Sequence, residues 1–425
     1  MQSDRRSETQ GRVHTDFSWW GAGSALRKQS LPHDVRVTRA ISALSVYEGF
    51  FAGGARIVHT DLLLGLQAKG HPQRVLSIYG KVRREATVQR LNSDASYRRL
   101  VAGGVPVTAL RQGFPGPEPF RPAELARVAR MASSARITHV LKEQPLAMLN
   151  QVGLAPGSVV VSLHRTDPEN HQEVLRELKI AVANGTVGAL ACCAETARDA
   201  YAAAGIPRSL LRVIPNGVDL GRFHPDWARR EKVRRAFGIP ADAPLVVLAA
   251  RYDGMKDVPL FLAAASRFLR DRPEAHVLMC GAGMSADNPL LGGDLAAAGL
   301  EDSPAVHLAG IRDDAEAVFA AADVVALTSS HGEAAPLCLI EGMVCGAVPV
   351  TTAVGDAAAL VAGRGLVTPA EPAAIAAAWQ EALARRAELA PAIHDARRQF
   401  DRSLMITGYA SLLAEVTGHP DLASA

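Results

Sequence analysis

The chain has 425 residues, which is too long for one ordinary domain and suits two α/β domains. Its 48% hydrophobic residues, 36 Gly and 25 Pro exclude a disordered or a collagen-like chain. The net charge of +3 gives no electrostatic footprint for nucleic acid. No apolar run approaches the roughly 18 residues that cross a bilayer. The polar, charged residues 1–32 lack the apolar core of a signal peptide.

The cysteines indicate a reducing compartment. They are odd in number, lie in apolar stretches and form no CxxC pair, so we expect reduced, buried thiols in a cytoplasmic protein. They are Cys192, Cys193, Cys280, Cys338 and Cys345. Residues 1–34 are expected to form a loosely ordered extension, with Trp19 and Trp20 as candidates for docking on the body of the protein.

The first half of the chain alternates between strand and helix patterns. The first strand is predicted over 36–46 and ends in a turn that contains Gly53 and Gly54. A helical pattern follows and closes at Gly70. Further strands are predicted at 74–79, 137–141, 158–163 and 187–193, with helical stretches between them. This alternation predicts a parallel sheet that is covered on both faces.

A turn-rich, aperiodic segment over 212–225 predicts a link between two domains. A second alternation follows it. Strands are predicted at 245–250, 276–280, 305–308, 323–328 and 348–351, and helices at 258–270, 315–321 and 337–345. The Ala-rich tail from 372 onward is predicted to be helical. We therefore expect an N-terminal Rossmann-like domain over 35–212 and a C-terminal one over 213–395. A last helix within 396–425 is expected to return to the first domain.

Two doubly wound α/β domains that face each other across a cleft would line it with strand ends and helix N-termini. Open α/β sheets bind ligands at such edges, and helix N-termini favour anions. A ligand that carries phosphate, bound between the domains, is therefore the expectation before any motif is considered.

The segment 328–342 places two carboxylates eight residues apart, with Glu333 in a loop and Glu341 inside the following helix. Backbone N–H groups at the start of this helix, that of Leu337 first, would point at a ligand. A capping Glu and a solvated Glu are the alternative interpretation. The apolar neighbours of Glu341 count against solvation of its carboxylate.

Two cations follow the strand at 245–250. Arg251 ends that strand and Lys256 lies across a glycine-containing turn, an arrangement that suits a diphosphate. A surface Arg/Lys pair is the alternative. Gly53 and Gly54 would let the backbone approach a phosphate or a sugar closely.

His164 follows the strand at 158–163 and would face the cleft, where it could donate a hydrogen bond or carry a proton. A purely structural histidine is the alternative. No D-x-D sequence occurs in the chain, so we predict neither a carboxylate-held metal nor a cofactor.

In their order along the chain, these motifs resemble the retaining family-4 glycosyltransferases of the GT-B fold, over about residues 42–379. The resemblance is carried by Gly53 and Gly54, Gly70 and His71, the hinge 213–225, Arg251 with Lys256, Gly281 with Gly283, 310–314, and Glu333 with Glu341. The resemblance implies a hexosyltransferase that moves a sugar from a UDP- or GDP-sugar to a hydroxyl acceptor without a metal. A nucleotide-sugar epimerase, a glycan synthase and a catalytically silent sugar-nucleotide-binding protein are the alternatives.

By the same resemblance, Arg251 and Lys256 would hold the diphosphate, while Glu333 would contact the sugar and Glu341 the ribose. The base would meet the backbone near Ile311 and Arg312. The resemblance further implies that the amide of Leu337 faces a phosphate or the sugar. Gly54 would allow the domains to close, and His164 would lie near the reacting sugar.

The acceptor is left open among a small cyclitol or natural product, a lipid-linked sugar and a glycan end. The basic segment 81–99 could attract an acidic acceptor or an anionic membrane surface. A solvated helix face is the interpretation that we favour for this segment.

Overall fold

The computed structural model describes residues 40–84 and 87–418. The predicted extension over 1–34, with Trp19 and Trp20, lies outside the described residues. Within the described ranges, no helix combines the length and the apolar composition needed to cross a bilayer.

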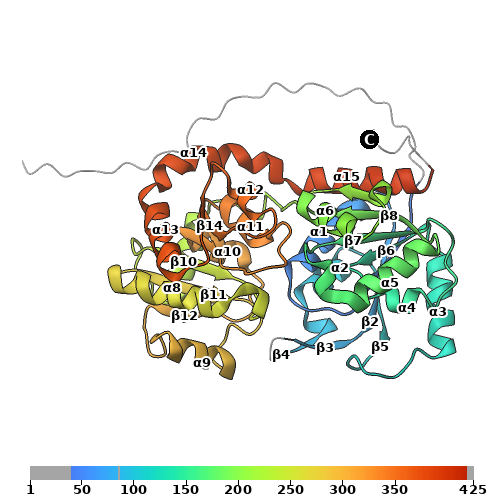
Figure 1. Ribbon diagram of the computed structural model, residues 1–425, viewed down its shortest axis with the longest axis horizontal. Helices are drawn as coiled ribbons and strands as arrows, with labels where there is room; N and C mark the ends of the chain where they lie inside the picture. Colours follow the sequence, from blue (N-terminus) through green and yellow to red (C-terminus); the bar gives the residue numbers. More distant parts are fainter. Residues whose placement is uncertain (1–39, 85–86, 419–425) are drawn as a thin grey trace, which may run out of the picture. The chain divides into compact units, whose positions relative to one another are not determined.

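The first lobe is built on a seven-stranded parallel sheet with the order β5-β2-β1-β6-β7-β8-β9 and helices on both faces (Figure 1). Its strands are β1 (Ala43–Tyr47), β2 (Gln73–Tyr79), β5 (Val107–Arg111), β6 (Ile137–Leu141), β7 (Val159–Leu163), β8 (Val187–Cys192) and β9 (Leu211–Val213). Its helices are α1 (Gly54–Ala68), α2 (Ala95–Ala102), α3 (Pro122–Ser133), α4 (Leu146–Leu149), α5 (Gln172–Ala183) and α6 (Glu195–Ala203). Every residue of β1, β6 and β7 is buried, as expected for strands covered on both sides.

The second lobe has a six-stranded parallel sheet with the order β12-β11-β10-β13-β14-β15. Its strands are β10 (Leu245–Ala249), β11 (His276–Cys280), β12 (Val306–Leu308), β13 (Val324–Leu327), β14 (Val348–Thr352) and β15 (Leu366–Thr368). Its helices are α7 (Trp227–Ala236), α8 (Val258–Asp271), α9 (Pro289–Ala297), α10 (Ala315–Ala321), α11 (Leu337–Val344), α12 (Ala357–Val361), α13 (Pro372–Ala384) and α14 (Arg386–Ala396). The predicted fold class, two doubly wound Rossmann-like lobes, is confirmed.

Two local predictions differ from the structure. Of the strand predicted over 36–46, residues 36–39 lie outside the described part of the chain; within that part the strand begins at Ala43, where the partner strands β2 and β6 also begin. The basic segment 81–99 is not one helix. It forms the antiparallel hairpin of β3 (Lys81–Arg84) and β4 (Thr87–Arg90), followed by a short turn and α2.

The last described helix, α15 (Arg402–Val416), packs against α1 of the first lobe. A Cβ added to Gly65 of α1 would lie 2.2 Å from Ile406 Cδ1, so a larger residue at this position would force the Ile406 side chain to move.

A buried chain of hydrogen bonds links α15 to the first sheet. Ser162 Oγ is 2.8 Å from Tyr409 Oη and 2.8 Å from His139 Nε2. His139 Nδ1 is 3.1 Å from His59 Nε2, and His59 Nδ1 is 2.8 Å from Tyr47 Oη. Burial lowers the pKa of His139 to about 3, so this ring is neutral at neutral pH. These hydrogen bonds therefore give each of the five buried polar side chains a partner without placing a charge in the core.

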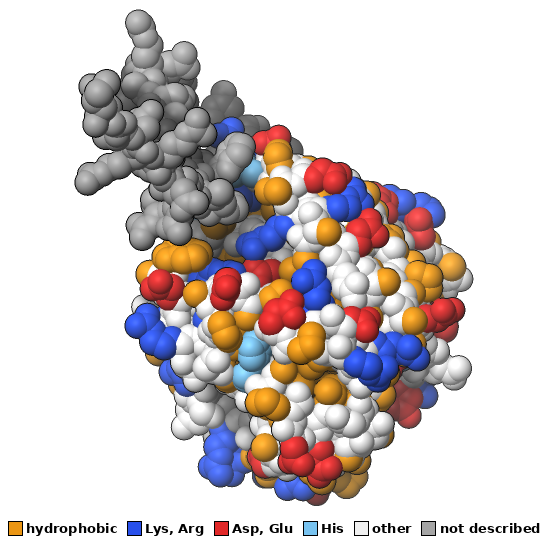
Figure 2. Space-filling model, turned by 90° about the vertical axis from the view of Figure 1, so that its left-hand side faces the viewer, with side chains coloured by type: hydrophobic (Ala, Val, Ile, Leu, Met, Phe, Trp, Pro, Cys, Tyr) orange, Lys and Arg blue, Asp and Glu red, His pale blue; other side chains and the backbone are white. Residues whose placement is uncertain are grey.

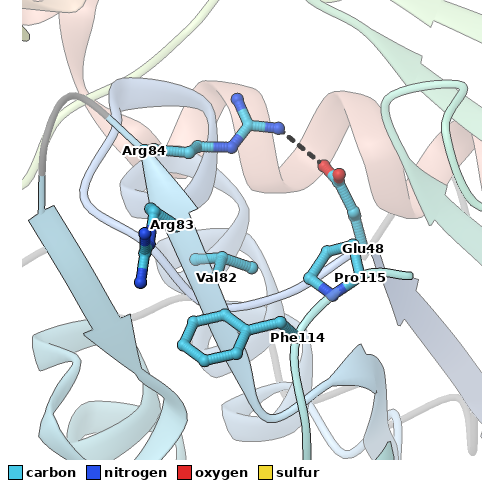
Figure 3. A pocket seen from close by; sticks show the side chains of 6 residues that line it. All are labelled: Glu48, Val82, Arg83, Arg84, Phe114 and Pro115. Carbon is cyan, nitrogen blue, oxygen red and sulfur yellow. Dashed lines mark hydrogen bonds and ion pairs between the residues drawn. The ribbon is translucent and has the colours of Figure 1, made fainter.

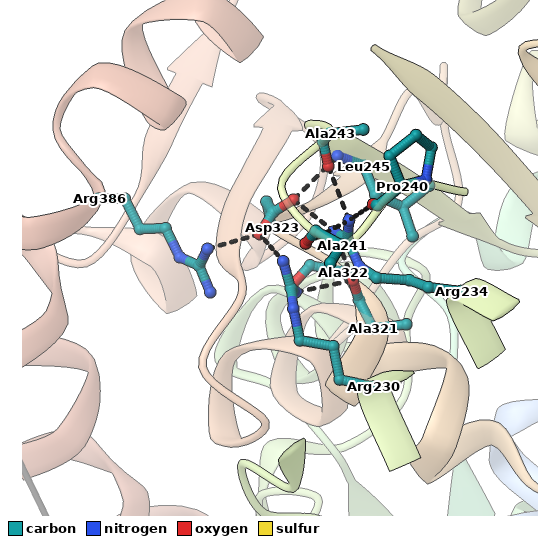
Figure 4. A network of polar contacts seen from close by, with 10 residues as sticks. All are labelled: Arg230, Arg234, Pro240, Ala241, Ala243, Leu245, Ala321, Ala322, Asp323 and Arg386. Atoms are coloured by element: carbon teal, nitrogen blue, oxygen red, sulfur yellow. Dashed lines mark hydrogen bonds and ion pairs between the residues drawn. The ribbon is translucent and has the colours of Figure 1, made fainter. Parts of the chain in front are cut away.

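A network of charged residues holds the second lobe together (Figure 4). Asp323, which precedes β13, accepts hydrogen bonds from Arg230 and Arg234 of α7 at 2.8 and 2.7 Å, and it pairs with Arg386 of α14. Burial alone would raise the pKa of Asp323, but the three guanidinium groups hold it below its ordinary value. One carboxylate thus joins the two helices to the start of a central strand.

The outer face of the second lobe, shown in Figure 2, carries side chains of both charge signs that are interspersed, and no single-sign patch forms on it. This mixture is typical of a solvated surface and gives no sign of an electrostatic partner on that face.

Replacing Tyr409 with Phe is expected to lower the free energy of unfolding by about 1 kcal/mol, because Ser162 loses one buried hydrogen-bond partner. Denaturant unfolding measures this loss. The matched control is Tyr97→Phe, since the Tyr97 hydroxyl has no hydrogen bond to a described residue. Equal effects of the two substitutions would contradict a stabilising role for the buried hydrogen bonds.

Candidate active site

Two helices, one from each lobe, begin beside each other. A Cβ added to Gly54, the first residue of α1, would lie 3.4 Å from Cβ of Leu337, the first residue of α11. Gly53 precedes α1 with extended backbone (φ 168°), and an added Cβ would meet nothing within 4 Å. Gly53 thus faces open space and Gly54 allows close contact where two helix N-termini meet, an arrangement that favours an anion.

Lys256 and Glu333 form a buried ion pair close to this point. The Lys256 ammonium donates to Glu333 Oε1, which also accepts a hydrogen bond from Ser329 Oγ at 2.6 Å. Burial alone would lower the pKa of Lys256, but the Glu333 carboxylate overcomes this effect and the pKa is raised. Lys256 is therefore a fixed positive charge in the physiological pH range.

Arg251 lies at the carboxyl end of β10 and pairs with Asp253 at 2.9 Å. Asp253 also accepts a hydrogen bond from the backbone N–H of Met255 at 2.9 Å, which fixes the turn that carries Lys256. Asp257 follows in the left-handed region (φ 48°) and caps α8 by accepting from Leu260 N at 3.2 Å. These local bonds hold both predicted cations on one turn.

The loop after β7 reaches this site from the first lobe. Thr166 Oγ1 donates to the backbone carbonyl of Glu333 at 2.8 Å. A Cβ added to Gly332 would lie 3.1 Å from Asp167 Oδ2. His164 begins the same loop, and burial, with smaller contributions from Lys142 and His139, lowers its pKa to about 3. His164 is thus a neutral ring next to a segment that contacts Glu333.

Glu341 is buried on α11, with 6% of its surface exposed. Its pKa is raised to about 8, mainly by burial; Arg222 lowers it, while Asp61 and Glu316 raise it further. Among the described residues, no group donates a hydrogen bond to this carboxyl. The group is therefore mostly protonated at neutral pH and has hydrogen-bonding capacity to spare.

The predicted base-binding residues follow β12. The side chain of Ile311 is 47% exposed, whereas Arg312 is held by Asp314 through two hydrogen bonds of 2.8 and 2.6 Å. The exposed apolar side chain of Ile311 offers a surface on which a flat ring could pack.

Sequence reasoning missed two cations of the first lobe, Lys142 and Arg165. Lys142 directly follows β6, and Arg165 directly follows the predicted His164. The sequence could have indicated these two residues, because each follows a predicted strand and the carboxyl ends of parallel strands lie along one edge of a sheet.

A cavity of about 490 Å³ opens at the carboxyl ends of β1, β2 and β5 (Figure 3). It is lined by Glu48, Val82, Arg83, Arg84, Phe114 and Pro115. Arg84 and Glu48 form an ion pair of 2.9 Å at one side, and the half-exposed ring of Phe114 lies at the other. The hairpin β3–β4 supplies the two arginines, so the basic segment 81–99 forms part of a pocket wall.

Two family models divide the chain between them. Residues 52–222 match Glycosyltransferase Family 4, and residues 243–385 match Glycosyl transferases group 1. The chain belongs to the family-4 glycosyltransferases.

Several curated relatives of this family-4 chain are D-inositol 3-phosphate glycosyltransferases. The protein of Xylanimonas cellulosilytica is 30% identical over 209 residues, which are 47% of this chain and 46% of the relative. That of Geodermatophilus obscurus is 35% identical over 151 residues, which are 33% and 32% of the two chains. The chain thus spans less than half the length of these relatives.

Solved structures confirm the GT-B fold of this family-4 chain. HepE of Anabaena in complex with UDP-glucose has a TM-score of 0.73 at 21% identity, covering 88% of this chain and 100% of that one. Sucrose-phosphate synthase of Thermosynechococcus elongatus has a TM-score of 0.68 at 19% identity, covering 89% and 100%.

The raised pKa of Glu341 predicts a pH-dependent stability in the absence of ligand. The unfolded chain loses this proton near its ordinary pKa of 4.5, whereas the folded chain keeps it to about 8, so stability falls as pH rises through this window. Glu341→Gln is expected to remove this contribution to the loss of stability between pH 5 and pH 8. Thermal unfolding at the two pH values measures the loss. The exposed Glu173→Gln serves as control and should leave the wild-type fall in place. An unchanged profile in Glu341→Gln would contradict the burial argument.

Proposed function

We propose that this protein is a retaining glycosyltransferase that moves a hexose from a UDP- or GDP-sugar to a hydroxyl acceptor. The observation that carries the proposal is the buried Lys256–Glu333 pair, which lies beside Arg251 and is contacted by the first lobe through Thr166. Family membership supports the same reaction class. HepE was solved with UDP-glucose, which supports a nucleotide-sugar donor.

We assign the donor to the second lobe. Arg251 and Lys256 hold the diphosphate, with the start of α11 at Leu337 supplying backbone N–H groups. Glu333 accepts hydrogen bonds from sugar hydroxyls, since its carboxylate is already oriented by Ser329. Glu341 takes the ribose hydroxyls. The backbone near Ile311 and Arg312 receives the base, and Gly53 and Gly54 leave room for the diphosphate.

The charge arrangement suits departure of a nucleotide diphosphate. The bond between the anomeric carbon and the phosphate oxygen breaks, and negative charge develops on the diphosphate. Lys256 and Arg251 stabilise that charge, and they are preorganised by Glu333 and Asp253. The acceptor oxygen forms the new bond on the same face, and its proton passes to the departing phosphate oxygen. His164, neutral at working pH, donates a hydrogen bond near the sugar.

We assign acceptor binding to the first lobe, over 35–212, and donor binding to residues 213–395, with the last helix belonging structurally to the first lobe.

We further propose a cytoplasmic location, which the burial of all five free cysteines supports. The relatives' name makes inositol 3-phosphate one compound to include among trial acceptors.

A donor and acceptor screen read by mass spectrometry tests the proposal. A glycosylated product supports transfer. Epimerised donor without acceptor would favour an epimerase, and nucleotide binding with neither product nor hydrolysis would favour a silent binding protein.

Lys256→Ala is expected to reduce turnover by about 10²-fold or more, because one preorganised transition-state donor is lost. Steady-state transfer measures the rate, and thermal unfolding checks that the variant still folds. Lys179→Ala, on an exposed part of α5, is the control and should keep the wild-type rate. A near-normal rate in Lys256→Ala would remove the assigned role.

Metal independence is also open to test. No group of three or more His, Cys, Asp or Glu that could hold a metal is found in the part of the chain that the structure describes. Because protein cations are proposed to stabilise the leaving group, transfer is expected to continue at its full rate after dialysis against EDTA. Loss of transfer that added Mg²⁺ or Mn²⁺ restores would overturn this part of the proposal.

A further inference from the structure

Two cations of the first lobe lie at the ends of neighbouring strands. Lys142 is the first residue after β6 and Arg165 is the second residue after β7, and these strands are hydrogen-bonded neighbours in the sheet. Lys142 N donates to Ser162 O at 3.0 Å, which fixes the two strand ends together. Both cations therefore lie on the edge of the sheet whose β7 loop contacts Glu333.

The backbone of Lys142 is held in an unusual conformation. Its φ is 60°, and Lys142 and Asp257 are the two non-glycine residues with positive φ in the described ranges. Lysine has no special tolerance for the left-handed region, so the surrounding structure must impose this conformation. Strain of this kind is concentrated at ligand-binding sites, and Asp257 directly follows Lys256.

Neither side chain has a counterion in the described structure. Arg165 forms no ion pair there, and its Nη1 is buried without any hydrogen-bond partner. Burial is the main cause that lowers the pKa of Lys142 to about 8; Arg251, Arg165 and Arg56 lower it further, and Glu143 raises it. The result is two half-buried cations that face further cations.

Among the described residues, neither nearby carboxyl group forms an ion pair with these cations. Glu143 Oε1 accepts a hydrogen bond from Tyr201 and Oε2 has no hydrogen-bond partner; burial raises the pKa of this carboxyl, although Arg165 and Lys142 lower it. Asp167 accepts a hydrogen bond from Asn170 at 3.3 Å. Arg251 and Lys256 of the other lobe have their own carboxylates, whereas Lys142 and Arg165 do not. A buried unpaired cation is costly, so this pair fits a site that an anion completes.

We propose that Lys142 and Arg165 bind a phosphate group of the acceptor, beside the place where the donor diphosphate lies. The inference rests on the proposed function, because it assumes that the second lobe supplies the donor site. The Arg165 guanidinium can donate two parallel hydrogen bonds to one phosphate, and the Lys142 ammonium adds a compact positive charge. This combination suits a phosphate monoester. The first lobe would then select acceptors by charge.

Inorganic phosphate is the probe, measured by calorimetry on the full chain with and without a saturating nucleotide, UDP or GDP. We expect phosphate to bind in the presence of the nucleotide, because the nucleotide diphosphate fills the Arg251–Lys256 site. The double variant Lys142→Gln, Arg165→Gln is expected to weaken phosphate binding by about tenfold or more, since two charge-assisted contacts are lost. Its nucleotide affinity should stay within about twofold of wild type, which also shows that it folds.

The matched control is Arg127→Gln, an exposed arginine on α3, which should leave phosphate binding unchanged. If the nucleotide abolishes phosphate binding and the double variant loses nucleotide affinity, the two cations serve the donor and the proposal is wrong. Absence of phosphate binding with nucleotide bound would also overturn it. If neither UDP nor GDP binds the wild-type chain, the proposed function fails instead, which is a separate result.

Discussion

The arrangement of the site depends on how Glu333 is held. Its carboxylate is fixed by Lys256 and Ser329 within the second lobe, while its backbone carbonyl accepts a hydrogen bond from Thr166 of the first. One residue is thus oriented through its side chain and tied across the lobes through its main chain. Any ligand that contacts this carboxylate also lies against the β7 loop, so the chemistry of both lobes acts on one small region.

Charge is distributed unequally over that region. Cations of the second lobe come with carboxylates that fix their position and keep them charged. Lys142 and Arg165 of the first lobe form no such ion pairs in the described structure, and burial, with the neighbouring arginines, lowers the pKa of Lys142. Glu341 shows the opposite effect, since burial makes it hold its proton. A suitably charged, hydroxyl-rich ligand would therefore offset part of the cost of burying these groups.

Much of the fold could be read from the sequence, because buried parallel strands are short apolar runs between turn residues. β6 and β11 were predicted with their observed ends, and the helices that follow β10 and β13 were found close to theirs. The hairpin β3–β4 was missed, since its basic residues mask the alternation that marks a strand. Glu333 and Glu341 were predicted from their spacing, which one helix and its preceding loop preserve. Lys142 and Arg165 are brought together only by the order of the strands, which a local pattern does not contain.

The attachment of α15 to the first lobe has a consequence for biosynthesis. Ser162 emerges from the ribosome long before Tyr409, which completes its buried hydrogen bonds. Until α15 arrives, the face of α1 that it covers, which includes Gly65, is uncovered. The lobe that is translated first is thus the one that finishes folding last, so the nascent chain must keep an apolar surface protected while the entire second lobe is made.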